Sequence, residues 1–248
     1  MYNFFVEADT LSEGVFRIEG ANNNHIKNVL RMRTGDTFLV SCNGKSHLCR
    51  LCCFEDDATL AEVVEEDYQD TELPVQLYLF QGLPKGDKLE LIIQKAVELG
   101  VHSIIPVEMN RSVVKLDEKK KKSKQERWQS IAESAAKQSK RNLIPTVNEA
   151  VSYKTAMKMA SEMDVFLVPY ENERGMAATA EALSKIKSGS KVGILIGPEG
   201  GFDESEVSAA RDVGGDIVSL GKRILRAETA AITALSMCML YIEMNACE

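Results

Sequence analysis

Four ionisable residues stand close together in the stretch SLGKRILRAETAAITALS, which runs from residue 219 to residue 236. Lys222, Arg223, Arg226 and Glu228 lie between a strand-like run and an uncharged segment that is typical of a buried helix. Ionisable groups at such a place need partners or a chemical role, because burying a charge is costly. We therefore take this stretch as a candidate catalytic site. A structural role at the start of the helix is the alternative.

A second candidate is the glycine-rich loop GPEGG at residues 197–201, which directly follows the apolar run VGILI. Glycines permit a tight turn and let the backbone approach a ligand closely. The chain contains neither G-x-G-x-x-G nor G-x-x-x-x-G-K-[ST], which argues against a dinucleotide site or a P-loop. The loop favours a nucleoside-like cofactor, with a plain structural turn as the alternative.

The elements that must position these loops follow from the pattern after residue 72. From Val75 onward, strand-like runs such as VQLYLFQ, SIIPV, DVFLVP, KVGILI and DIVSL alternate with helical segments. Asp203 and Glu206 have the spacing of a capping box and predict the start of one helix there. Such alternation predicts an α/β domain with a mostly parallel sheet and helices on both faces. Ligands in these sheets bind beyond the carboxyl ends of the strands.

The first 72 residues show a different pattern, of short strands and turns. DTFLVSCNGKSHLCRLCCF reads as two strands around Asn43-Gly44, a strong hairpin signal. A preceding segment places Ile26, Val29 and Leu30 at helical spacing and predicts a helix that ends near Gly35. We expect a small β-barrel over residues 1–72 and the α/β domain over residues 73–248, because an acidic stretch closed by Pro74 separates them.

Charge is segregated along the chain. The 248 residues carry a formal net charge of −7, which argues against a protein that coats nucleic acid indiscriminately. Residues 1–70 hold six Lys or Arg against thirteen Asp or Glu, whereas residues 111–141 hold eleven against four. This basic stripe keeps a role facing RNA open. A solvated helix end is the alternative for the lysine run itself.

The six cysteines indicate free thiols in a reducing compartment. The spacing of Cys49 and Cys52 invites a zinc or redox site, but a strand would put them on opposite faces, and no second pair of matching spacing exists. We expect no metal. The N-terminus lacks a signal-peptide pattern, and the uncharged run from Thr229 to Ile242 is too short to span a membrane. A cytoplasmic protein without a membrane segment is expected.

Several motifs together resemble one family, the bacterial small-subunit (16S) ribosomal RNA uridine-N3 methyltransferases. They are HIKNVLRMRTGD, KGDKLELIIQKAVELGV, NRSVVK in place of ERSVVK, the pair Arg127-Trp128, IGPEGGF and LGKRILRAETA. They occur in the family's order and cover nearly the whole chain. Departures at Lys137, Lys140, Lys222 and Ala227 put local RNA contacts in doubt and leave the chemistry untouched.

The resemblance implies a PUA-like β-barrel followed by a SPOUT domain whose parallel sheet contains a trefoil knot. It implies S-adenosylmethionine as cofactor, 16S ribosomal RNA in the small ribosomal subunit as partner, and a homodimer. It also implies the cofactor pocket, which comprises Pro169, Tyr170, Glu171, Ile196, Gly197, Pro198, Glu199, Gly200, Gly201, Leu220, Gly221, Ile224, Leu225, Arg226, Thr229 and Ala230.

Within this resemblance, Arg226 and Glu228 are the candidate catalytic residues. Arg226 would stabilise the charge that gathers on a uridine carbonyl as N3 loses its proton, and Glu228 would accept that proton or orient Arg226. The uridine must be unpaired or turned out of its stack to expose N3. RNA-binding candidates outside the pocket are Lys27, Arg31, Arg33, Arg111, Lys119, Lys120, Lys121, Lys122 and Arg141.

Two other functions stay open at this point. One is a related knotted methyltransferase that acts on transfer RNA or on a ribose 2′-hydroxyl. The other is a non-catalytic RNA-binding assembly factor, although such a factor would be expected to show a degraded GPEGG loop or to lack Arg226.

Overall fold

The computed structural model describes residues 1–171 and 175–245 and divides into two compact units. The first unit consists of Met1–Glu72 and Ala136–Ile144. The second consists of Leu73–Ala135 and Pro145–Glu248. The boundary near residue 72 thus coincides with the division, but the segment Ala136–Ile144 joins the first unit, where we had expected it in the second.

A six-stranded mixed sheet forms the first unit, in the order β1-β4-β5-β6-β3-β2. Only β1 and β4 run parallel; the other neighbours are antiparallel. The strands are β1 Asn3–Phe5, β2 Leu11–Ser12, β3 Val15–Glu19, β4 Thr37–Cys42, β5 Lys45–Phe54 and β6 Ala58–Glu65, and a short 3₁₀ helix covers Ala8–Thr10. Phe16, Phe38 and Ile18 are among the fully buried side chains of its core.

The hairpin prediction at Asn43-Gly44 is confirmed, since both residues have positive φ (50° and 77°) between β4 and β5. The helical segment before it is shorter than expected. It comprises α1 Gly20–Asn24 and a π-helical turn His25–Val29, and it ends where Arg31 takes a φ of 53° instead of running to Gly35. A residue in the left-handed region cannot continue a right-handed helix.

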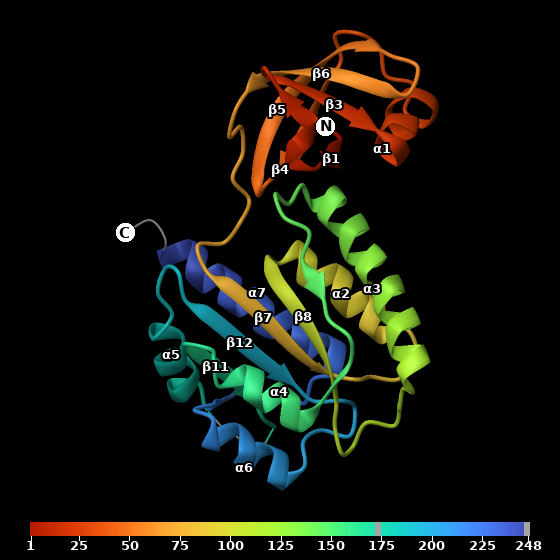
Figure 1. Ribbon diagram of the computed structural model, residues 1–248. Helices are drawn as coiled ribbons and strands as arrows, with labels where there is room; N and C mark the ends of the chain where they lie inside the picture. Colours follow the sequence, from red (N-terminus) through yellow and green to blue (C-terminus); the bar gives the residue numbers. More distant parts are fainter. Residues whose placement is uncertain (172–174, 246–248) are drawn as a thin grey trace. The chain divides into compact units, whose positions relative to one another are not determined.

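The second unit contains a parallel sheet in the order β10-β8-β7-β12-β11-β13, with β9 beside β8 (Figure 1). Its strands are β7 Gln76–Gly82, β8 Val101–Glu108, β9 Thr146–Val147, β10 Val151–Ser152, β11 Val165–Pro169, β12 Lys191–Ile196 and β13 Asp216–Val218. Its helices are α2 Lys88–Glu98, α3 Glu118–Ser139, α4 Tyr153–Ala160, α5 Ala177–Ser184, α6 Glu204–Asp212 and α7 Ala227–Asn245, with the end of α3 belonging to the first unit.

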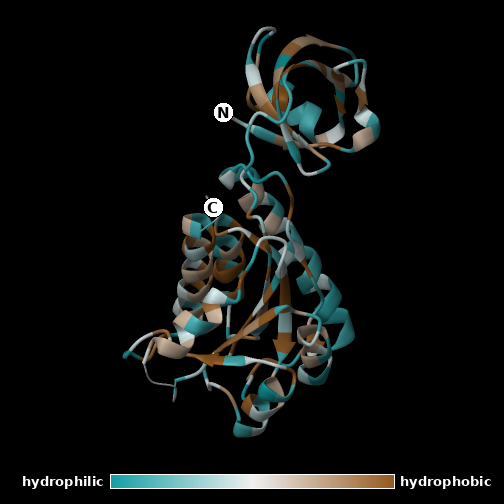
Figure 2. Ribbon diagram, turned by 90° about the vertical axis from the view of Figure 1, so that its left-hand side faces the viewer, coloured by the Kyte–Doolittle hydropathy of each residue, from teal (hydrophilic) through white to brown (hydrophobic). Residues whose placement is uncertain are grey.

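Helices cover both faces of this sheet, as the alternating pattern predicts. The helices α4 and α6 pack on one face around Phe80, Phe166 and Leu195. The helices α2 and α7 pack against each other and lie on the opposite face (Figure 1). Because the central strands β7, β8, β11 and β12 are buried on both sides, they are mostly hydrophobic along their length (Figure 2). The capping box of α6 is present as expected, with Asp203 as N-cap and Glu206 at N3.

Candidate functional site

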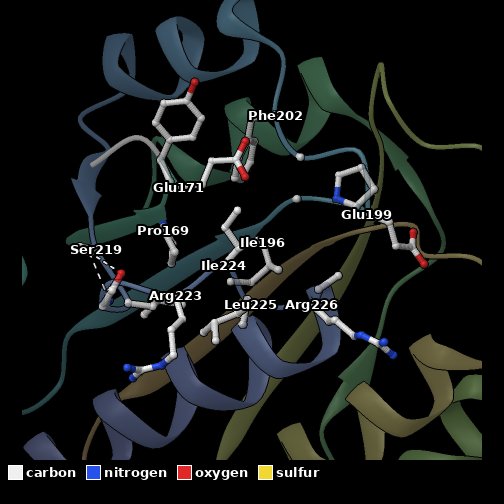
Figure 3. Close-up of a pocket in the computed structure, with 18 of the residues that line it drawn as sticks. Pro169, Glu171, Ile196, Glu199, Phe202, Ser219, Arg223, Ile224, Leu225 and Arg226 are labelled. Carbon is white, nitrogen blue, oxygen red and sulfur yellow. Dashed lines mark hydrogen bonds between the residues drawn. The ribbon is translucent and has the colours of Figure 1, made fainter. Parts of the chain in front are cut away.

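A pocket of about 430 Å³ opens at the carboxyl ends of β11, β12 and β13. Three loops line it: the segment after β11, the glycine-rich loop after β12, and the chain from Ser219 into the first turn of α7. These strands are neighbours in the sheet although they are far apart in sequence, and their loops therefore meet at one edge. Figure 3 shows Ile196, Ile224 and Leu225 near the middle of this pocket.

Most of the residues predicted to bind the cofactor line this pocket. They are Pro169, Tyr170, Glu171, Ile196, Gly197, Pro198, Glu199, Gly201, Leu220, Gly221, Ile224, Leu225, Arg226 and Ala230. Two predicted residues, Gly200 and Thr229, are not among the lining residues.

Gly200 instead faces Arg111, which donates a hydrogen bond of 3.1 Å from Nη1 to the Gly200 carbonyl. A β-carbon at Gly200 would lie 2.9 Å from the Arg111 β-carbon, so only glycine fits between the loop and Arg111. Arg111 also approaches Asp203 to 3.9 Å. Arg111, which we expected to hold RNA, therefore supports the glycine-rich loop.

Buried hydrogen bonds set the position of the loop after β13. The Thr179 hydroxyl of α5 donates to the Ser219 carbonyl at 2.9 Å and accepts from the Ser219 N–H at 3.0 Å. Thr179 is 1% exposed, so water cannot replace these bonds easily. At the neighbouring loop, the Tyr170 N–H donates to the Val218 carbonyl at 3.0 Å. Two walls of the pocket are thus tied together by the backbone and one buried hydroxyl.

Six lining residues were not predicted: Lys88, Phe202, Ser219, Lys222, Arg223 and Ala227. Five of them adjoin predicted residues in sequence and would have been found by extending each loop. Lys88 lies more than 80 positions before the first of the loops. It begins α2, the helix after β7, and only the pairing of β7 with β12 brings it to the site.

Arg226 stands at the start of α7, where its carbonyl accepts the first helical hydrogen bond from the Ala230 N–H at 2.8 Å. Its side chain is exposed and makes no hydrogen bond or ion pair within residues 1–171 and 175–245. Figure 3 shows its guanidinium extending from the edge of the pocket on the same side as Glu199. An unpaired cation at a helix N-terminus is well placed to meet an anion.

Glu228 does not pair with Arg226 in the described part of the chain. Its side chain is 16% exposed, and its Oε2 lies 3.7 Å from the Lys88 Nζ. The same oxygen is buried without a hydrogen-bond partner among the described residues. A carboxylate oxygen in that condition has the capacity to accept a proton or a hydrogen bond from a ligand.

Glu199 lines the pocket, but its carboxylate is bound by the protein itself. The Lys88 Nζ donates to Oε1 at 2.8 Å, and the Lys85 N–H reaches Oε1 and Oε2 at 3.1 and 3.3 Å. Burial by itself raises the pKa of the Glu199 carboxyl, but the hydrogen bonds from Lys88 and the backbone outweigh it and lower the pKa. The hydrogen bond with Glu199 also raises the pKa of Lys88.

The RNA-binding candidates of the first unit divide into exposed and buried residues. Lys27, Arg31 and Arg33 are exposed. Arg141, in contrast, is 3% exposed, and its guanidinium binds the Glu72 carboxylate. The prediction that Arg141 contacts RNA is corrected by this burial: Arg141 holds Ala136–Ile144 against the end of the first segment of its unit.

The lysine run begins α3 and is only partly available. Lys119 and Lys122 are exposed and have no ion pair within the described residues. Lys120 pairs with Asp117 at 3.1 Å. Lys121 is 16% exposed and pairs with Glu118 and Glu108. Two of the four lysines therefore present free ammonium groups.

The cysteines form no metal cluster in the described residues, and Cys247 lies outside them. Cys49 is fully buried in β5, whereas Cys52 of the same strand is partly exposed. Burial raises the pKa of the Cys49 thiol to about 12, which makes it a poor nucleophile. Among the described helices, none has the length and apolar character to cross a membrane.

Comparison with known proteins places these features in one family. Residues 71–239 match the model of the RNA methyltransferase domain. The chain is 42% identical over 243 residues to ribosomal RNA small subunit methyltransferase E of Bacillus subtilis (strain 168), covering 95% of both chains. It is 34% identical to the protein of the same name from Mesomycoplasma hyopneumoniae (strain 232), covering 96% of this chain and 99% of that one.

Solved structures agree with the sequence relatives. A crystal structure of ribosomal RNA small subunit methyltransferase E from Neisseria gonorrhoeae bound to S-adenosyl methionine superimposes with a TM-score of 0.80. Its sequence is 33% identical, and the match covers 97% of both chains. The chain therefore belongs to the RNA methyltransferase family, in the branch that ribosomal RNA small subunit methyltransferase E represents.

Proposed function

We propose that this protein transfers the methyl group of S-adenosylmethionine to N3 of a uridine in the 16S RNA of the small ribosomal subunit. The observation that carries the proposal is the pocket itself, where the glycine-rich loop and the 219–226 loop enclose one space with an unpaired arginine at its edge. The 42% identical relative is named as a methyltransferase of small-subunit ribosomal RNA. The motifs of the sequence support uridine N3 as the acceptor.

The pocket fits a nucleoside-like cofactor in size and in chemistry. Its volume of about 430 Å³ lies in the range of small-molecule sites. Ile196, Ile224 and Leu225 offer apolar contact to a base, and the backbone of the Gly197–Gly201 loop offers hydrogen bonds to its edge. When bound, S-adenosylmethionine supplies an electrophilic methyl group on a sulfonium. Gly200 and Thr229 do not line the pocket, and this proposal therefore gives them no contact with the cofactor.

Two residues at the start of α7 suit the acceptor: Arg226, which lines the pocket, and Glu228, which lies close to it in sequence and is not among the lining residues. Uridine N3 carries a proton and becomes a nucleophile only when that proton leaves. We assign Glu228 Oε2, which has no hydrogen-bond partner, as the proton acceptor, and Arg226 as the donor to the carbonyl that gathers charge. The N3–methyl bond then forms as the carbon–sulfur bond breaks. Holding both reactants in line supplies much of the remaining acceleration.

We further propose that the first unit is a PUA-like barrel that contacts RNA through Lys27, Arg31 and Arg33, all of which are exposed. The chain from β12 into α7 would form the trefoil knot of a SPOUT domain, consistent with the parallel sheet and with the similarity to the Neisseria gonorrhoeae structure. A homodimer is consistent with the exposed Leu240 and Met244 of α7, which are 50% and 70% exposed.

The direct test combines cofactor binding with mapping of the product. We expect calorimetry to detect S-adenosylmethionine binding, and small ribosomal subunits incubated with protein and cofactor to yield 3-methyluridine on nuclease digestion and mass spectrometry. Subunits incubated without cofactor are the control. A methyl group found on a ribose 2′-hydroxyl instead would show that the protein is a methyltransferase but would refute uridine N3 as its acceptor. Absence of cofactor binding would support the assembly factor instead.

The contribution of α3 to RNA binding is tested by salt titration. We expect Lys119→Ala/Lys122→Ala to reduce the slope of log K against log salt by about 1 to 2, because each lysine that neutralises a phosphate contributes about 0.7 to 0.9. The matched control is Lys120→Ala, whose ammonium is already paired with Asp117 and should change the slope less. An unchanged slope in the double variant would assign these lysines to a solvated helix end.

A further inference from the structure

Lys88, a lining residue of the pocket, contacts two carboxylates that lie far from it in sequence. It begins α2, after β7, and its ammonium lies between Glu199 of the glycine-rich loop and Glu228 of α7. The distances are 2.8 Å to Glu199 Oε1 and 3.7 Å to Glu228 Oε2. No other described lysine or arginine forms an ion pair with either carboxylate.

The two contacts of Lys88 are unequal. The contact with Glu199 has hydrogen-bond length, and the Lys85 N–H donates to the same carboxylate, so Glu199 is fastened to the start of α2. The contact with Glu228 is only electrostatic, and its Oε2 lacks a hydrogen bond. Lys88 thus holds Glu228 by charge and leaves its buried Oε2 with unused capacity to accept a hydrogen bond.

Arg226 completes this group of charges. Its proximity lowers the pKa of Lys88, although the hydrogen bond with Glu199 outweighs that effect. With two cations and two carboxylates, the group is formally neutral. Lys88 is the cation that pairs with both carboxylates, and Arg226 has no ion pair among the described residues. Figure 3 shows Glu199 and Arg226 on this one side.

From this geometry we infer that Lys88 is a positioning residue. It fastens the glycine-rich loop through Glu199 to the first turn of α7 through Glu228, and so places Glu228 and Arg226 for the acceptor base. The inference rests on the proposed function for its catalytic consequence. Its structural part, the fastening of the loop, stands independently of any reaction.

The structural part is tested by hydrogen exchange on the full-length protein without cofactor. We expect Lys88→Met to speed exchange in peptides covering residues 197–202 by about 10-fold, because a hydrogen bond to a charged group is lost. Lys88→Arg should retain most of the protection. The matched control is Lys95→Met, which removes a lysine of the same helix that pairs, among the described residues, with Glu98 alone. Unchanged exchange in Lys88→Met would overturn the inference.

The catalytic part is tested by single-turnover methyl transfer at saturating cofactor. We expect Lys88→Met to slow the transfer by about 10- to 100-fold, since a misplaced catalytic group is costly. In the Glu228→Gln background the same substitution should change the rate less than about 2-fold, because a residue that acts through Glu228 has nothing left to position. If Lys88→Met slowed the transfer by the same factor in the wild-type and Glu228→Gln backgrounds, the positioning of Glu228 by Lys88 would be overturned.

These two readouts separate the inference from the proposed function. Faster exchange in Lys88→Met, with no methyl transfer by the wild-type protein, would refute the proposed function and support the fastening of the loop. Methyl transfer by the wild-type protein, with identical exchange and rates in Lys88→Met, would support the function and overturn the inference.

Discussion

Arg226→Ala is expected to slow methyl transfer by on the order of 10²- to 10³-fold, the range seen when one preorganised donor to a developing oxyanion is removed. The side chain is exposed and has no ion pair among the described residues, so its loss breaks no contact that holds the fold. Cofactor affinity should change by less than the rate, because the guanidinium extends from the pocket's edge (Figure 3). Single-turnover rates and calorimetry measure the two quantities separately.

Two variants sharpen the interpretation of Arg226. Arg226→Lys keeps the charge and loses the planar fork, so we expect it to recover part of the rate. Arg211→Ala removes an exposed arginine of α6 outside the pocket and serves as the matched control. A rate within a few-fold of wild type in Arg226→Ala would remove Arg226 from the mechanism.

Gly82→Ala is expected to destabilise the second unit and to weaken cofactor binding. A β-carbon at Gly82, the last residue of β7, would lie 2.7 Å from the Pro198 nitrogen and 2.7 Å from the Met109 sulfur. The methionine can move, but the Pro198 backbone can do so only by shifting the glycine-rich loop. Forcing an extra methyl group into a packed site costs about 1 to 3 kcal/mol. Denaturant unfolding measures this loss directly.

The binding consequence of Gly82→Ala follows from the same contact. Because Pro198 lines the pocket, a shift of its backbone should reduce affinity for S-adenosylmethionine by about 10-fold or more, which corresponds to about 1.4 kcal/mol. The control is Gly86→Ala, where a β-carbon meets nothing within 4 Å and the cost arises from the φ of 63° alone. Gly86→Ala should lower the free energy of unfolding without a comparable loss of affinity for S-adenosylmethionine. Equal affinity in both variants would contradict the steric argument.

Local signals were sufficient for much of the fold. The hairpin at Asn43-Gly44, the capping box at Asp203 and the alternation of strands and helices each depend on residues a few positions apart. The early end of the helical segment before Arg31 and the pairing of Ala136–Ile144 with the first unit were missed. The placement of Ala136–Ile144 was missed because it depends on a contact between residues far apart in sequence. Arg141 binds Glu72, and no local sequence pattern predicts that partner.

The site shows the same division. The order of residues along the chain, by itself, determined two of the loops that line the pocket, at 197–201 and 220–226, because their glycines and charges lie next to recognisable strands. The third loop, at residues 169–171, was expected only from the resemblance to a family. Only the tertiary structure decided that Lys88 joins Glu199 to Glu228, that Arg111 supports Gly200, and that Lys121 is paired. The physical reason is that hydrogen bonding and backbone conformation act between near neighbours in sequence. Ion pairs at a sheet edge instead depend on which strands lie side by side, and that order is set by packing of the whole unit.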